Sequence, residues 1–308
     1  MKNSRRYKRW LIGTALPFLL FLLLFYGPIS SFRVLWIQTA MHTSHCKFLA
    51  QWLYTDRYIQ KVLQENQVVA EQKTEASLIQ IEDPDEIIQL EELDGNYYRG
   101  YLMAVSDPSR ISLVPAQTAE GELLEDITAR TEAVGGINAG GYLSDRQQGL
   151  PDAFCVAGGF ILRPVSDDHQ LHVVGGMDRK NRLLVGMYSP QELEQMDYQW
   201  AVEFGPVLIV NGEKAKITGL AGGLAPRAAI GQTANGTILM VVIDGRQPKS
   251  VGATYLDLQR IFVEYSAINA IVLDGGSSCS MLYEGRIINS PSSGAEARRL
   301  PNAIVIQE

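Results

Sequence analysis

Short apolar runs that end in turn residues recur along most of this chain. Two of them, residues 238–243 and 270–273, are rich in β-branched residues and are each followed by Asp-Gly, a pattern typical of buried strands. Between them, residues 254–265 place apolar side chains on one helical face, and Thr254 with Asp257 resembles a capping box. We therefore predict a strand–helix–strand (βαβ) unit whose two strands run parallel.

The two Asp-Gly turns follow corresponding ends of these strands. We expect Asp244 and Asp274 to lie side by side at the carboxyl edge of the sheet, where open α/β sheets hold their ligands. The second turn continues with small residues that let backbone N–H groups and hydroxyls approach an anion or a sugar, namely Gly275, Gly276, Ser277 and Ser278. The alternative is that both aspartates only form Asx turns. Two such turns at one edge favour a ligand site.

Further short apolar segments separated by Gly, Pro and Asp follow Gly95. Those expected as strands are residues 101–105, 111–114, 160–163, 183–188 and 207–210. A second helix is expected over 189–196. The fold class is therefore α+β, a β-rich mixed-sheet domain that contains the βαβ unit.

The N-terminus carries five basic residues before position 10 and then an uncharged run from Trp10 to Ile29. As a helix this run is roughly 30 Å long, about one hydrocarbon thickness. It is either an uncleaved membrane anchor or a signal peptide with its apolar core at 11–25. We favour the anchor because no small-x-small cleavage site follows. With the basic flank in the cytoplasm, the remaining chain would be extracellular.

Residues 44–66 carry apolar side chains at helical spacing, which predicts an amphipathic helix next to the membrane. Residues 67–94 are acidic and are interpreted as a linker with some helix. We therefore divide the chain into a basic tail and transmembrane anchor (1–30), a juxtamembrane helix and linker (31–95), and a folded domain (96–308).

Charge and cysteine content narrow the class of protein. The 308 residues carry a net charge of −7, and the part outside the membrane is more acidic still, so we exclude nucleic acid as a partner. The three cysteines, Cys46, Cys155 and Cys279, form no C-x-x-C pair. We expect buried free thiols, with a Cys155–Cys279 bridge as the alternative.

Four more glycine-bearing segments are expected to form turns near a ligand, at 135–142, 157–159, 203–207 and 226–231. In the first, Asn138 with Gly140 and Gly141 is suited to hydrogen bonding with a sugar. Arg227 and Arg246 are suited to a bidentate phosphate contact. The structural alternatives are a capped turn at Asn138, an ion pair at Arg227 and tight packing at the glycines.

Other chemistries find less support. The chain has no Gly-x-Ser-x-Gly motif, Walker loop or dinucleotide fingerprint. Neither pair of histidines, at 42 and 45 or at 169 and 172, has a third ligand at zinc-site spacing. We therefore expect no cofactor and assign no metal ligands. Divalent-metal binding at the aspartates is left open as an alternative, but no sequence motif supports it.

Seven blocks of sequence, in order, resemble the signature blocks of the phosphodiester glycosidase family. They are 137–142 (INAGGY), 205–212 (GPVLIVNG), 226–231 (PRAAIG), 242–246 (VIDGR), 250–252 (SVG), 273–278 (LDGGSS) and 302–305 (NAIV). This family includes the uncovering enzyme N-acetylglucosamine-1-phosphodiester α-N-acetylglucosaminidase and bacterial proteins of exopolysaccharide biosynthesis. Ser277 and Cys279 stand where many members have glycine and serine.

The resemblance implies hydrolysis of a sugar such as GlcNAc from a sugar-1-phosphodiester in a surface glycan or exopolysaccharide. Glycoside cleavage usually employs two carboxylates, and our first choice is Asp274 with Asp244, with Glu203 in reserve. Arg227, Arg246 and the turn at 275–278 would hold the phosphodiester. The alternative is a non-catalytic glycan-binding or polymer-assembly factor.

Overall fold

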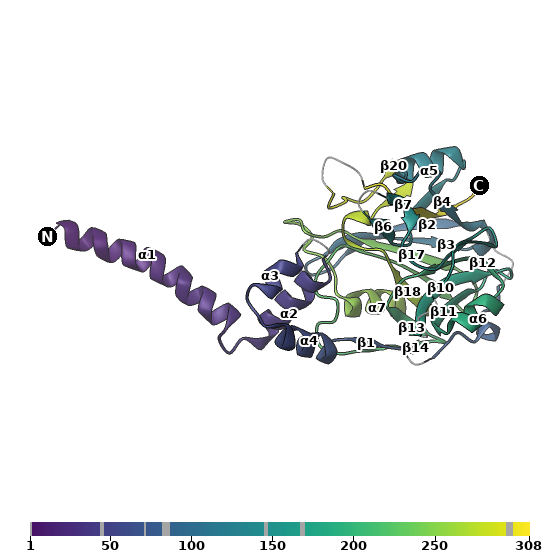
Figure 1. The fold of residues 1–308 in the computed structure, drawn as a ribbon. Helices are drawn as coiled ribbons and strands as arrows, with labels where there is room; N and C mark the ends of the chain where they lie inside the picture. The colour runs from purple at the N-terminus through teal and green to yellow at the C-terminus, as the bar shows by residue number, and fades with distance from the viewer. Residues whose placement is uncertain are drawn as a thin grey trace. The chain divides into compact units, whose positions relative to one another are not determined.

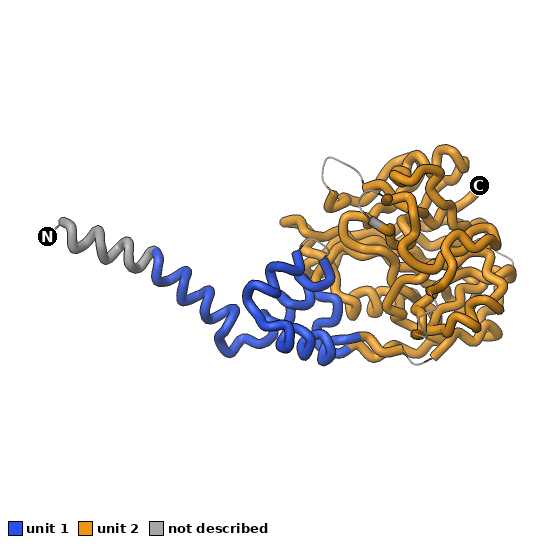
Figure 2. Tube along the Cα trace, viewed as in Figure 1, with its two compact units in different colours: residues 1–67, 218–223 blue, residues 68–217, 224–308 orange. Residues whose placement is uncertain are grey.

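The computed structural model describes residues 2–43, 46–70, 72–81, 87–144, 147–166, 170–293 and 298–308, with only the backbone of residues 2–13 and 144. The chain divides into two compact units, coloured separately in Figure 2. Unit 1 comprises residues 1–67 and 218–223, and unit 2 comprises residues 68–217 and 224–308.

Unit 1 is helical. Its helices are α1 (Lys2–Phe25), α2 (Ser30–Met41), α3 (Lys47–Gln51) and α4 (Asp56–Glu65). A small core of Ile37, Ala50, Ile59 and Val62 joins α2, α3 and α4. The single amphipathic helix predicted over 44–66 is therefore wrong in detail, because the chain breaks at 52–55 and Thr55 caps α4 by accepting a hydrogen bond from the Tyr58 N–H.

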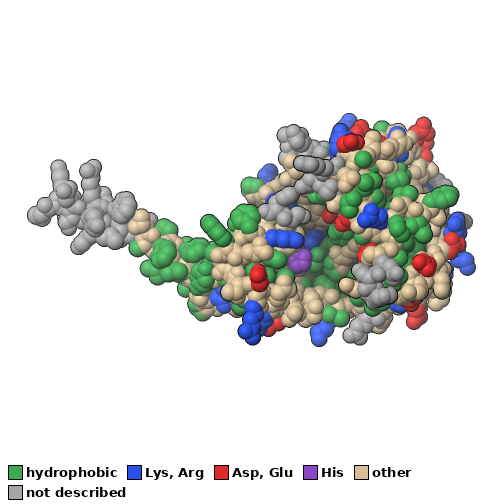
Figure 3. All heavy atoms as spheres, in the orientation of Figure 1, with side chains coloured by type: hydrophobic (Ala, Val, Ile, Leu, Met, Phe, Trp, Pro, Cys, Tyr) green, Lys and Arg blue, Asp and Glu red, His purple; other side chains and the backbone are tan. Residues whose placement is uncertain are grey.

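Apolar side chains cover the described part of α1 (Figure 3), and Leu16, Phe18 and Leu19 are each more than half exposed. Within the described residues, no single helix has the length and hydropathy of a membrane span. The segments Thr14–Phe25 and Ser30–Met41 meet that test only together, and they are bent by 80°. The side chains of residues 10–13, the start of the predicted anchor, lie outside the described part of the chain, and membrane anchoring by residues 10–29 stays a prediction.

Three sheets form the body of unit 2 (Figure 1). The seven-stranded sheet has the order β14 (Glu213–Lys214), β13 (Val207–Val210), β18 (Ala267–Leu273), β16 (Arg227–Thr233), β17 (Ile238–Ile243), β3 (Arg99–Val105), β2 (Ile88–Asp94). A five-stranded sheet has the order β11 (Leu183–Tyr188), β10 (His172–Asp178), β12 (Tyr198–Glu203), β8 (Cys155–Ala157), β9 (Phe160–Arg163). The other five-stranded sheet has the order β20 (Arg286–Ile287), β19 (Met281–Tyr283), β5 (Gly135–Asn138), β21 (Asn302–Ile306), β4 (Ile111–Pro115).

Smaller elements complete unit 2. They are the pairs β1 (Val68–Val69) with β15 (Lys216–Ile217) and β6 (Tyr142–Ser144) with β7 (Gln147–Pro151), the helices α5 (Leu124–Arg130), α6 (Pro190–Gln195) and α7 (Tyr255–Glu264), and the short 3-10 turns Ala76–Leu78, Pro108–Arg110 and Gly276–Ser278. One apolar cluster, including Met103, Ile137, Trp200 and Ile271, draws on all three large sheets. Burying each such side chain contributes roughly 1.5–3 kcal/mol.

The predicted strand–helix–strand unit is present, with one correction. Strands β17 and β18 run parallel, as predicted, because each pairs antiparallel with β16. They are not neighbours, however, since β16 lies between them, and the adjacent strand pairs that the structure describes are antiparallel. The capping box at Thr254 and Asp257 is confirmed: each side chain accepts a hydrogen bond from the other residue's backbone N–H.

Two other sequence-based expectations are corrected here. The segment 226–231, predicted as a turn, is the buried central strand β16, where Gly231 leaves room for the ring of Phe262 from α7. The acidic segment 67–94, predicted as a linker, ends in strand β2, which pairs with β3 over seven positions. Acidic side chains on an exposed edge strand explain both its composition and its misassignment.

Candidate functional site

Arg227 lies between the two aspartates at one edge of the seven-stranded sheet. It pairs with Ile243, the residue before Asp244, and its neighbour Ala228 pairs with Leu273, the residue before Asp274. The prediction that Asp244 and Asp274 share a sheet edge is therefore confirmed, and Arg227, which was expected in a turn, lies at that edge as well. The two aspartates flank β16 rather than adjoining each other.

The Asp274 side chain is partly buried, and its neighbours shift its pKa in opposite directions. Burial raises its pKa to about 6, against the lowering effect of hydrogen bonds from the Ser278 hydroxyl and the Gly275 N–H. The charge of Asp152 raises this pKa further and that of Arg298 lowers it. A carboxyl with a pKa near 6 is available in both protonation states near neutral pH, which suits acid–base chemistry.

The segment 139–141 accepts backbone hydrogen bonds from both Asp274 and Asp152. The Asp274 N–H donates to the Ala139 carbonyl oxygen at 2.9 Å, and the Asp152 N–H donates to the Gly141 carbonyl oxygen at 3.2 Å. A Cβ atom on Gly141 would lie 2.7 Å from Asp152 Oδ2, so a side chain at position 141 would displace that carboxylate. The glycine is therefore required for the close approach of Asp152.

Asn138 and Asn302 are fully buried, and their side chains bond to the Asp274 turn and to the segment 139–141 respectively. Asn138 Nδ2 donates to the Asp274 carbonyl oxygen at 2.7 Å, and its Oδ1 accepts from the Ser280 N–H at 3.2 Å. Asn302 Oδ1 accepts from the Gly140 N–H at 2.7 Å. The Asn138 side chain and the Gly140 N–H therefore form hydrogen bonds within the protein. Their contacts with a sugar stay a prediction.

Glu203 is the third acidic residue of this site and lines the same cavity as Asp152. Glu203 Oε1 lies 2.8 Å from Nδ1 of the buried His172, and Oε2 accepts from the Phe154 N–H at 3.2 Å. Burial and the charge of Glu203 raise the pKa of Asp152. A cavity of about 330 Å³ is lined by Asp152, Ala153, Phe154, Arg163, Pro164, Val165, Ser166 and Glu203.

Two guanidinium groups lie on the other side of the turn at Asp274. Arg227 is buried over the ring of Tyr255, 4.2 Å from the centroid, and its Nε donates to the Ala253 carbonyl oxygen. A Cβ atom on Gly276 would lie 3.3 Å from a terminal nitrogen of Arg246. The thiol of Cys279 is buried among these charges, and burial raises its pKa well above the usual range.

The glycine-rich turn itself is largely closed on the protein. The Gly275 N–H donates to Asp274 Oδ1 at 2.9 Å, the Gly276 N–H to the Pro226 carbonyl oxygen at 3.0 Å and the Ser278 N–H to the Gly275 carbonyl oxygen at 3.3 Å. These N–H groups, expected to face an anion, therefore stabilise the turn. Substrate contacts by Gly275, Gly276, Ser277 and Ser278 remain predictions.

Asp244 anchors a loop. Its Oδ1 accepts hydrogen bonds from Asn289 Nδ2 at 2.8 Å and from the Ser290 N–H at 2.9 Å, and its side chain is 8% exposed. Burial raises the pKa of Asp244, while these two hydrogen bonds lower it. These hydrogen bonds give Asp244 a structural role in holding the loop at Asn289 and Ser290. Its catalytic role stays a prediction.

The sequence analysis missed Asp152, His172, Asn302 and Arg298 as parts of this site. Asp152 directly follows strand β7, but this strand is not an apolar run and no glycine follows the aspartate, so the signal that identified Asp244 and Asp274 was absent. The turn predicted at 157–159 is confirmed, since Gly158 and Gly159 form a two-residue hairpin turn with φ of 57° and 81° between β8 and β9. Cys155 and Cys279 are buried free thiols, as predicted.

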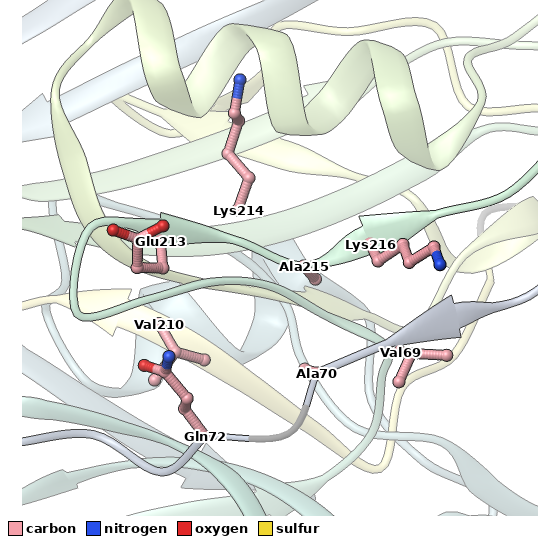
Figure 4. A pocket seen from close by; sticks show the side chains of 8 residues that line it. All are labelled: Val69, Ala70, Gln72, Val210, Glu213, Lys214, Ala215 and Lys216. Carbon is pink, nitrogen blue, oxygen red and sulfur yellow. The ribbon is translucent and has the colours of Figure 1, made fainter.

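A second cavity, of about 310 Å³, lies around β1, β14 and β15 and includes Lys214 and Lys216 (Figure 4). The two lysine side chains point in different directions, and none of the aspartates described above lines it. We therefore place the candidate active site at Asp274, Asp152 and Glu203.

The fold of unit 2 is that of the phosphodiester glycosidases. The chain belongs to the Phosphodiester glycosidase family, whose sequence profile matches residues 131–307. Over 71 residues it is 44% identical to the SPbeta prophage-derived uncharacterized protein YomE of Bacillus subtilis (strain 168), a stretch that covers 23% of this chain and only 11% of that relative.

Solved structures show the same fold. The catalytic domain of zebrafish N-acetylglucosamine-1-phosphodiester alpha-N-acetylglucosaminidase, auto-inhibited by its pro-peptide, has a TM-score of 0.62 at 17% identity, covering 78% of this chain and 89% of that chain. A putative exported protein from Burkholderia pseudomallei K96243 has a TM-score of 0.52 at 16% identity, covering 68% and 74% respectively.

Proposed function

We propose that this protein hydrolyses a sugar-1-phosphodiester, releasing the sugar and a phosphomonoester. The observation that carries the proposal is Asp274, a partly buried carboxyl with a pKa of about 6 beside the carboxylate of Asp152, in a chain of the phosphodiester glycosidase family. A glycosidase needs two carboxyl groups near the anomeric carbon. We assign this pair to Asp274 and Asp152, because the backbone of each is hydrogen-bonded to the segment 139–141 and the charge of Asp152 acts on Asp274.

In this reaction water attacks the anomeric carbon, and the bond from that carbon to the phosphate-linked oxygen breaks. One proton of the water is taken by a carboxylate, and the phosphomonoester leaves with the bonding electron pair. Glu203 is hydrogen-bonded to His172 and to the Phe154 N–H, and its charge raises the pKa of Asp152, which favours the protonated form of that aspartate. Arg298, whose charge acts on Asp274, is placed to offset charge on the departing phosphate.

We infer further that the sugar is GlcNAc-like, that the substrate is a surface glycan or exopolysaccharide, and that the catalytic unit is extracellular. The zebrafish enzyme's name supports the sugar class, and the basic flank before an apolar N-terminal run supports the location. The similarity to a Bacillus subtilis protein agrees with a Gram-positive bacterial context.

The test uses the purified full chain with GlcNAc-1-phosphodiesters and UDP-GlcNAc, measuring released GlcNAc. Turnover by the wild type that is lost in Asp274→Asn, with folding and ligand binding kept, supports the enzyme. Asp107→Asn is a matched control, since that carboxylate caps a 3-10 turn and its Oδ1 accepts from the N–H and hydroxyl of Ser109. Binding without turnover across a broad panel would instead assign the chain to a non-catalytic glycan-binding class.

A further inference from the structure

Strand β9 carries three consecutive exposed apolar residues. The side chains of Phe160, Ile161 and Leu162 are 77%, 58% and 43% exposed. Because alternate residues of a strand face opposite sides, exposure at three successive positions leaves both faces of β9 uncovered. The register with β8 shifts so that Leu162 has no counterpart, which marks a β-bulge.

This arrangement needs an explanation because β9 is the edge strand of its sheet. Proteins usually protect edge strands with charged residues or proline, and a run of exposed large apolar residues there favours association with something apolar. The run 160–162 holds no charge, and the first cation comes immediately after it, at Arg163.

The apolar run leads directly into the candidate active site. The next residues of the chain, Arg163, Pro164 and Val165, line the 330 Å³ cavity together with Asp152 and Glu203. Arg163 is close enough for its charge to lower the pKa of Asp152. An apolar strip, a guanidinium group and a carboxylate cluster therefore follow one another along a single path.

We propose that the alcohol esterified to the substrate's phosphate is an apolar chain, which lies along 160–162 with the phosphate at Arg163 and the sugar at the carboxylates. This inference rests on the proposed function and narrows its substrate class to sugar phosphodiesters of lipid-like alcohols. The order of the three chemical features on the protein matches the order of chain, phosphate and sugar in such a molecule. Hydrolysis would release the sugar and leave an alkyl phosphate on the strip.

The test compares methyl and octyl diesters of the same sugar phosphate, used as monomers in solution with the full chain. We expect kcat/KM to be at least about tenfold higher for the octyl diester, mainly through KM, because burying the CH₂ groups of the octyl chain against residues 160–162 favours binding. In the variant Phe160→Ser/Ile161→Ser/Leu162→Ser the preference should disappear while the methyl diester is hydrolysed as before. Leu90→Ser is the matched control, an exposed leucine on the edge strand β2.

A binding measurement separates this inference from the proposed function. Octyl phosphate should bind the wild type more tightly than methyl phosphate in calorimetry, and the triple variant should lose that difference with an unchanged melting temperature. Turnover of both diesters at equal kcat/KM would overturn the apolar-chain assignment and leave the hydrolase intact. If neither diester is hydrolysed but octyl phosphate still binds more tightly, the proposed hydrolase function is overturned and the apolar binding site at 160–162 is supported. If the strip matters only for substrate embedded in vesicles, it is a membrane contact and the assignment is wrong.

Discussion

The side chain of Asn138 donates a 2.7 Å hydrogen bond to the backbone carbonyl oxygen of Asp274. Its oxygen accepts from the Ser280 N–H, so one buried carboxamide spans the start and the end of the Asp274 turn. The turn thereby has a fixed backbone, which positions the Asp274 carboxyl against the segment 139–141.

Replacing Asn138 should therefore disturb both folding and catalysis. Asn138→Ala leaves a buried carbonyl and a buried N–H without their partner, which we expect to lower the unfolding free energy by about 1–3 kcal/mol. A displaced turn should also reduce kcat by up to about 100-fold. Urea denaturation and steady-state kinetics measure the two effects. Asn235→Ala, at an exposed turn, should change neither, and an unaltered kcat in Asn138→Ala would contradict the positioning role.

The raised pKa of Asp274 makes stability depend on pH. Its value rises from 3.8 to about 6 on folding, so the folded state holds the proton more tightly. This contribution to stability is fully present below about pH 4 and is lost as the pH rises through 6. Asn cannot ionise, so the unfolding free energy of Asp274→Asn relative to wild type should increase by on the order of 2–3 kcal/mol between pH 4 and 7. Denaturant titrations across this range measure it, and a pH-independent difference would refute the assignment.

Neighbouring charges should move the titration of Asp274 in opposite directions. Asp152→Asn removes the negative charge that raises the Asp274 pKa, so that pKa should fall. Arg298→Gln removes a positive charge that lowers it, so the pKa should rise. Carboxyl carbon NMR titration follows the group directly, without relying on activity. Shifts of the same sign in both variants would show that the two side chains act through structure rather than charge.

Local sequence patterns predicted much of the fold. Apolar runs bounded by turn residues located β17 and β18, and the capping box located the start of α7, because these signals depend on neighbours in sequence. The partner strand β16 was missed because its alanines and its one glycine resemble a turn, and only packing against Phe262 requires so small a residue at position 231. The order of strands depends on long-range pairing, which periodicity does not encode.

The candidate site was predicted in part for the same reason. The shared edge of Asp244 and Asp274 follows from the parallel direction of β17 and β18, whereas the position of Arg227 between them depends on β16, which was not predicted. The approach of Asp152 to Asp274 depends on the segment 139–141, which contacts residues well separated from it in sequence. Such long-range contacts leave no local sequence pattern, so the proximity of Asp152 to Asp274 could not be predicted.

Asp244 and Asp274 can be told apart by isosteric substitution. Asp244→Asn keeps an oxygen that accepts from Asn289 and Ser290, so we expect kcat to stay within about threefold of wild type, unlike Asp274→Asn. Asp244→Ala and Asn289→Ala should each cost about 1–3 kcal/mol of unfolding free energy, because both remove the hydrogen bond between these side chains. Steady-state kinetics and denaturation of these four variants distinguish a catalytic role of Asp244 from a structural one. If Asp244→Asn loses turnover while keeping wild-type stability, Asp244 is a catalytic carboxylate and the loop-anchoring role does not account for it.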